Sequence, residues 1–135
     1  MRKLFILLFI VVLSCQPTKE GTDLGDLKAE VMAIHDEVMP KIGELRRARK
    51  DLMLQADSIV ESDSSRAFML NEIAVEIESA NESMMEWMRA FEPEFEGTDE
   101  EIETYLEEQK KSIQKVKDDM EDALKKGMDA LTAEE

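Results

Sequence analysis

Cysteine and histidine are nearly absent from this chain of 135 residues, which contains one of each, Cys15 and His35. A single thiol cannot form an internal disulfide. Nucleophilic catalysis needs a thiol or hydroxyl held beside a base, but the sequence has one imidazole and no serine in a nucleophile-elbow motif. The chain therefore lacks the parts of the common catalytic triads, and we predict no enzymatic activity.

Glycine and proline are also scarce, with five and three residues, whereas 36% of the side chains are charged and 43% are hydrophobic. This composition is typical of long helices and differs from that of a disordered acidic tail. Basic side chains are outnumbered by acidic ones, 17 to 32, which gives a net charge of −15. Because such a surface repels polyanions, we predict no nucleic-acid partner.

One continuous apolar run is present, over the ten residues 4–13, directly after Arg2 and Lys3. It is shorter than the roughly 20 apolar residues that span a bilayer, but it matches the hydrophobic region of a secretory signal peptide. The run leads into Ser14-Cys15, which resembles the bacterial lipobox. In that motif the cysteine receives a diacylglyceryl group and becomes the new N-terminus. The pattern predicts a lipoprotein signal peptide over residues 1–14 and lipidation of Cys15, with acyl chains such as palmitate.

Two alternatives to the lipid anchor remain open, namely an ordinary cleaved signal peptide and an uncleaved signal anchor. Gln16 beside the cysteine resembles the sorting signal of lipoproteins sent to the outer membrane, so we expect an anchor there with the protein facing the periplasm. Without residues 1–14 the chain has 121 residues, with 15 basic and 32 acidic side chains and a net charge of −17. Such a body is held at a membrane by its acyl chains and not by a basic patch.

The remaining sequence divides into a tether and a helical region. Residues 15–26 contain Pro17, Gly21 and Gly25 with few apolar side chains, which predicts a flexible tether. From there on, apolar residues recur every three or four positions, which predicts helices over about 24–60, 64–91 and 99–131. Polar turn residues separate the helices, and the residues from Thr98 to Glu101 form a capping-box pattern.

The three predicted helices define the expected fold class, an all-α, three-helix up-down-up antiparallel bundle over residues 27–131, with coiled-coil-like packing. The same apolar spacing would also support an extended coiled coil between chains. The polar turns favour folding back, so we expect a monomer or a weak oligomer. Pro40 lacks the amide that would donate to the Asp36 carbonyl, which predicts a kink between His35 and Pro40.

Antiparallel packing is expected to gather unusual side chains at one end of the bundle, which we call the Met-aromatic end. It comprises residues of all three helices: Met32, His35, Met39, Met84, Met85, Trp87, Met88, Phe91 and Tyr105. Three interpretations remain open. The side chains fill an irregular core beside the kink, they offer an adaptable groove to a partner helix, or some of them bind a soft metal.

The soft-metal interpretation concerns Cu(I) or Ag(I), which prefer thioether and imidazole donors. Its candidate ligands are His35 and the thioethers of Met32, Met39, Met84 and Met88, with Trp87 as a cation–π cover. No other cofactor is predicted. The alternative function is accordingly that of a periplasmic Cu(I)- or Ag(I)-binding protein.

Three segments also resemble a family. They are HDEVMPKIGE at 35–44, MMEWMRAF at 84–91, and Tyr105-Leu106 leading into IQKV at 113–116. Together they are similar to the small Bacteroidota lipoproteins often labelled "viral A-type inclusion protein", a label that reflects generic coiled-coil similarity. The resemblance implies a bacterial envelope setting and no particular activity. We expect a lipid-anchored, non-enzymatic binding or structural component with an envelope protein as its partner.

Overall fold

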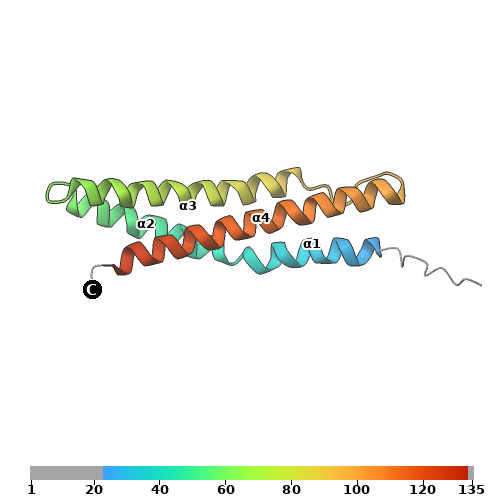
Figure 1. Ribbon diagram of the computed structural model, residues 1–135, viewed down its shortest axis with the longest axis horizontal. Coiled ribbons are helices and arrows are strands. Elements are labelled where there is room, and N and C mark those ends of the chain that lie inside the picture. Colours follow the sequence, from blue (N-terminus) through green and yellow to red (C-terminus); the bar gives the residue numbers. More distant parts are fainter. Residues whose placement is uncertain (1–22, 134–135) are drawn as a thin grey trace, which may run out of the picture.

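The computed structural model describes residues 23–133, which form four consecutive helices and no strand (Figure 1). The helices are α1 (Leu24–Val38), α2 (Lys41–Ile59), α3 (Ser64–Ala90) and α4 (Asp99–Thr132). Because α1 and α2 are the two halves of one bent helix, the predicted all-α bundle of three helices is confirmed. The predictions for the signal peptide, for Cys15 and for most of the tether lie outside the described residues.

The bend between α1 and α2 lies at Met39 and Pro40, within the segment where the kink was predicted. The Met39 amide still donates to the His35 carbonyl at 3.0 Å, and the Ile42 amide turns to the Met39 carbonyl at 3.2 Å. Pro40 itself keeps helical angles, with φ −60° and ψ −27°. The missing proline amide therefore interrupts the hydrogen-bond ladder without reversing the chain.

Side-chain caps fix where the other helices begin. Asp63 accepts from the Arg66 amide at 2.9 Å at the start of α3. At the start of α4 the Thr98 amide donates to the Glu101 carboxylate at 2.8 Å, and the Glu101 amide donates to the Thr98 hydroxyl at 3.3 Å. These reciprocal bonds satisfy amides that a helix start leaves without partners, and they confirm the predicted capping box.

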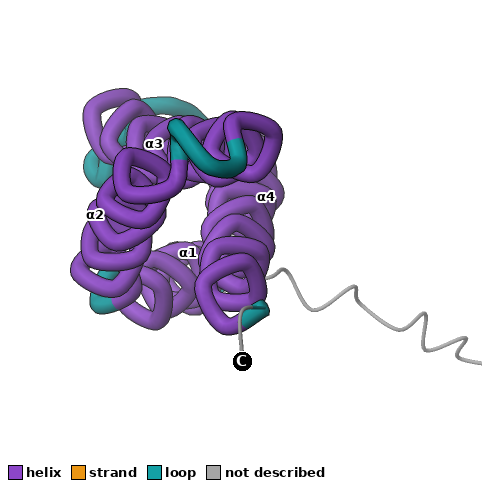
Figure 2. The backbone as a smooth tube through the Cα atoms, turned by 90° about the vertical axis from the view of Figure 1, so that its left-hand side faces the viewer, coloured by secondary structure: helices purple, strands orange, loops and turns teal. Residues whose placement is uncertain are grey.

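The bend changes which helices pack together. α2 packs against α3 and α4, whereas α1 packs chiefly against α4. The end-on view places α1 and α3 on opposite sides of the bundle (Figure 2). The two halves of the bent helix therefore have different neighbours.

Core side chains differ between the two ends of the bundle. Small side chains such as Ala48, Ala74 and Gly127 let α2, α3 and α4 approach closely. A Cβ at Gly127 would lie 2.9 Å from Cδ1 of Ile77. At the other end, Met84 and Trp87 occupy the core where α1 has moved away from α3. Small core side chains thus lie where α2, α3 and α4 meet, and the bulky Met84 and Trp87 lie where α1 and α3 make few contacts.

Ion pairs link the helices over their surface. Lys28 contacts Glu94 at 2.8 Å, and Lys117 contacts Glu37 at 2.6 Å. The hydrogen bond from Lys28 lowers the pKa of the Glu94 carboxyl, and the hydrogen bond to Glu37 raises the pKa of Lys117. Ion pairs at the protein surface add little stability, so the apolar core holds the fold. None of the described helices has the length and apolar character needed to cross a membrane.

Candidate functional site

The Met-aromatic end is assembled from α1, α3 and the start of α4, as the antiparallel geometry predicted. Met84 is fully buried and Trp87 is 6% exposed, and both belong to the core. Met39, Met88 and Phe91 are half-buried and pack against that core. The bend at Pro40 and the α2–α3 turn therefore bring distant parts of the sequence to the same level of the bundle.

Five rings form a continuous series through this end. His35 lies 5.8 Å from Trp87, and Trp87 stacks on Phe91 at 4.8 Å, between ring centroids. Tyr105 continues the series 6.3 Å from Phe91 and 4.3 Å from Phe95. The Tyr105 hydroxyl also accepts a hydrogen bond from the Glu92 amide at 2.7 Å. The series joins α1, α3, the α3–α4 connection and α4 into one apolar cluster.

Phe95 was missed by the sequence analysis. It lies in the acidic connection between α3 and α4, where apolar spacing gives no helix signal. Its only sequence signal is that it is an aromatic residue flanked by glutamates on both sides. The structure shows that it extends the Met-aromatic end by one ring.

The His35 ring is held in a defined orientation. Its Nδ1 lies 2.9 Å from the Asp36 carboxylate, and its side chain is 17% exposed. When Nδ1–H donates to that carboxylate, Nε2 of the neutral ring keeps its lone pair as an acceptor or metal ligand. The neighbouring Trp87 Nε1 is buried and has no hydrogen-bond partner among the described residues. The cluster thus contains one oriented imidazole and one unpaired indole donor.

Most of the candidate soft-metal ligands belong to the core or pack against it. Met84 and Trp87 are core residues, Met39 and Met88 pack against the core, and His35 contacts Trp87. Met32 is half-buried on α1 and is not among the described residues packed against that core. No group of three or more histidine, cysteine, aspartate or glutamate residues in the described chain is placed to bind a metal. Any metal site here would depend on the thioethers.

The opposite end of the bundle has a feature that the sequence analysis did not anticipate. Large apolar side chains lie on its surface, on α2, at the end of α2, on α3 and on α4: Met53, Leu54, Val60, Phe68, Met69, Val75 and Met128. In the sequence these residues can be recognised because they fall between the apolar positions that recur every three or four residues and form the core.

No protein-family model, no curated protein and no solved structure matches the chain, so its function must be inferred from its own residues.

Proposed function

We propose that this protein is a lipid-anchored, non-enzymatic component of the bacterial envelope, with a binding or structural role on the periplasmic side. The observation that carries the proposal is the order of Arg2 and Lys3, ten apolar residues and then Ser14-Cys15. A diacyl modification provides stable membrane attachment, whereas one acyl chain binds only marginally. The anchor would therefore be sufficient without a basic surface.

The bundle is compatible with an anchor at its N-terminal side. α1 begins beside the α3–α4 connection, where Lys28 pairs with Glu94 at 2.8 Å. A lipid on Cys15 would thus hold the Met-aromatic end nearer the membrane. The α2–α3 turn lies at the far end of α3, whose 27 residues extend about 40 Å. The exposed apolar side chains near that turn would then face away from the bilayer.

Metabolic labelling with a palmitate analogue tests the anchor. We expect labelled wild-type protein in the membrane fraction, and loss of label and of maturation in Cys15→Ala. Gln16→Ala is the matched control, since it changes the adjacent residue, leaves the thiol in place and should stay labelled. Undiminished label in Cys15→Ala would contradict the proposal.

The second candidate function is Cu(I) or Ag(I) binding at the Met-aromatic end. The specific observation that favours it is that His35 lies against Trp87, that Met84 is buried in the same core one turn away on α3, and that Met39 and Met88 pack against this core. The free Nε2 of His35 and two or three thioethers would form a soft donor set. The indole face of Trp87 would lie beside the cation.

Competition with a chromogenic Cu(I) chelator tests this candidate. Metal binding predicts one tightly bound Cu(I) that is lost in His35→Ala and in Met88→Leu, with helicity retained. Met128→Leu is the control, because Met128 is exposed at the other end of the bundle. A wild-type protein that takes no Cu(I) from the chelator would leave core packing as the role of these side chains.

A further inference from the structure

Four exposed apolar side chains follow one side of the α2–α3 hairpin. Met53 and Val60 on the α2 side are 40% and 52% exposed, and Phe68 and Val75 on α3 are 67% and 64% exposed. The members of each pair are seven residues apart, so they lie on the same side of their helix. Contiguous exposed apolar surface is a common mark of an interaction site.

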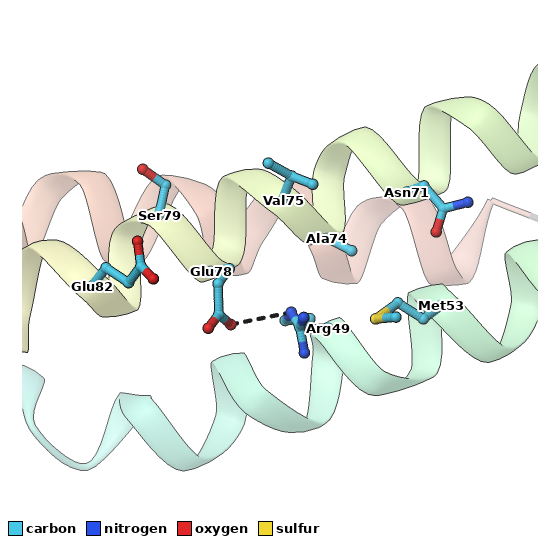
Figure 3. Close-up of a pocket in the computed structure, with 8 residues that line it drawn as sticks. All are labelled: Arg49, Met53, Asn71, Ala74, Val75, Glu78, Ser79 and Glu82. Atoms are coloured by element: carbon cyan, nitrogen blue, oxygen red, sulfur yellow. Dashed lines mark ion pairs between the residues drawn. The ribbon is translucent and has the colours of Figure 1, made fainter.

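A shallow groove shows that these sides of α2 and α3 face the same way. It has a volume of about 280 Å³, and its lining includes Met53 from α2 and Ala74 and Val75 from α3. Arg49 and Glu78 point toward one another across it, with their charged atoms 3.1 Å apart (Figure 3). We call this side the α2–α3 face.

Charged residues of opposite sign continue the α2–α3 face toward the middle of the bundle. Arg46 and Lys50 on α2 lie on the side of Met53, and Glu82 and Glu86 on α3 lie on the side of Val75, by their spacing. All four are exposed. None of them forms an ion pair within residues 23–133. The face is therefore basic along α2 and acidic along α3, next to its apolar part.

We propose that the α2–α3 face binds the same face of a second copy of this chain and forms a two-fold symmetric dimer. With the symmetry axis parallel to the helices, α2 of one copy lies on α3 of the other. The Arg49–Glu78 pair shows which residues of the antiparallel helices α2 and α3 lie at the same height along the hairpin. At those levels Arg46 meets the partner's Glu82, and Met53 meets the partner's Val75. Val60 meets the partner's Phe68, so apolar and opposite-charge surfaces both match.

The charges also distinguish between the possible symmetry axes. An axis perpendicular to the helices would place α2 on α2, so basic side chains face basic side chains wherever the two copies of the Arg46–Lys50 segment overlap. Like charges held opposite one another disfavour that arrangement. An unrelated partner helix would need to supply both signs at the right levels, whereas a second copy supplies them by symmetry.

The size of the face predicts a weak dimer. α2 has 19 residues and is about 28 Å long, and two helices side by side are about 20 Å wide. The area that this face offers lies at the lower end of the range for specific protein–protein interfaces, so we expect a dissociation constant in the micromolar range.

The dimer does not depend on lipidation. If Cys15 is lipidated as proposed, an axis parallel to the helices places both anchors at the same end.

Sedimentation equilibrium of residues 16–135, which contain all four helices and their common core, tests the dimer. We expect a monomer–dimer equilibrium that Phe68→Glu and Val75→Glu each weaken at least tenfold, with helicity unchanged by circular dichroism. Leu54→Glu is the matched control. Leu54 is 57% exposed but is turned about 100° from Met53 around the helix, outside the groove. A monomeric mass at millimolar concentration, or equal weakening by Leu54→Glu, would overturn the proposal.

Charge reversal tests the orientation and separates the dimer from the proposed anchor. Arg46→Glu and Glu82→Arg should each weaken association several-fold. The double variant Arg46→Glu/Glu82→Arg should restore it, because the opposite charges face each other again. This soluble chain lacks Cys15, so the result is independent of lipidation. A double variant that associates no better than either single variant would contradict the proposed pairing.

Discussion

The imidazole of His35 lies 5.8 Å from the indole of Trp87 and links α1 to α3, although these helices pack chiefly against other partners. The bend at Pro40 separates α1 from α3, and the large rings fill the space between them. Adaptable and bulky side chains suit a core where helix spacing is irregular. Because Trp87 fills the space between α1 and α3, we expect its replacement to lower stability more than that of any other residue at the Met-aromatic end.

Replacing Trp87 should reveal how much packing the indole provides. Trp87→Ala is expected to lower the free energy of unfolding by about 3–5 kcal/mol, because it leaves a cavity between α1 and α3. Trp87→Phe should cost less, since it keeps a ring and removes the buried unpaired Nε1. Urea denaturation measures both values. Equal losses for the two variants would contradict a packing role.

Replacing methionine by leucine should be well tolerated at the same end of the bundle. Met84→Leu and Met88→Leu nearly conserve volume and should each cost less than about 1.5 kcal/mol. Met84→Ala is the contrasting variant and should cost about 2–5 kcal/mol, because Met84 is fully buried. Denaturation midpoints at unchanged slope measure the differences. A Met84→Leu variant as unstable as Met84→Ala would show that the sulfur itself is needed.

Replacing each of two helical glycines by alanine should change the stability of the protein in different ways. At Gly43 a Cβ would meet no heavy atom within 4 Å, so Gly43→Ala should stabilise the protein by about 0.5–1 kcal/mol through helix propensity. At Gly127 the same Cβ would lie 2.9 Å from the buried Ile77 side chain. Gly127→Ala should therefore gain less or destabilise. Thermal unfolding of the two variants side by side gives the difference, and an equal gain at both sites would refute it.

The capping box should make part of the stability depend on pH. The amide and hydroxyl of Thr98 donate to the Glu101 carboxylate and lower its pKa. Because the pKa is lower in the folded state, this contribution is present above the ordinary glutamate pKa of about 4.3 and is lost as pH falls through the folded value. Glu101→Gln should be less stable than wild type at neutral pH.

Well below that range the two proteins should unfold at the same temperature, since neither side chain at position 101 is then charged. Glu92→Gln is a suitable control, because its carboxylate lies outside the capping box. The measurement is the melting temperature of each variant across pH. A difference between Glu101→Gln and wild type that persists in acid would contradict the proposed linkage.

The sequence predicted the helices well because their ends carry local signals. Asp63, Thr98 and Glu101 cap helix starts, and Pro40 interrupts the backbone hydrogen bonds. These effects act over three or four residues, so they can be recognised without knowing the fold. The position of His35 beside Trp87 followed from the lengths of the helices and the turn.

Other features depended on how the helices pack, and local patterns could not reveal them. Ala48 and Ala74 are core residues, but alanine is also common on exposed helix surfaces. Asn81 is buried at a position where an apolar side chain would be expected. Phe68 and Val75 are apolar but exposed. Distinguishing these cases requires the neighbours of each helix, which only the tertiary structure supplies.

α4 is the last of the described helices and the one that the three others contact. Since α1 packs chiefly against α4, it has no large apolar surface to cover it until the C-terminal third of the chain has been made. Synthesis proceeds from the N-terminus, and domains fold as units once their parts are available. During synthesis α2 and α3 can therefore pack together first, whereas α1 should stay without its main packing partner until α4 has been made.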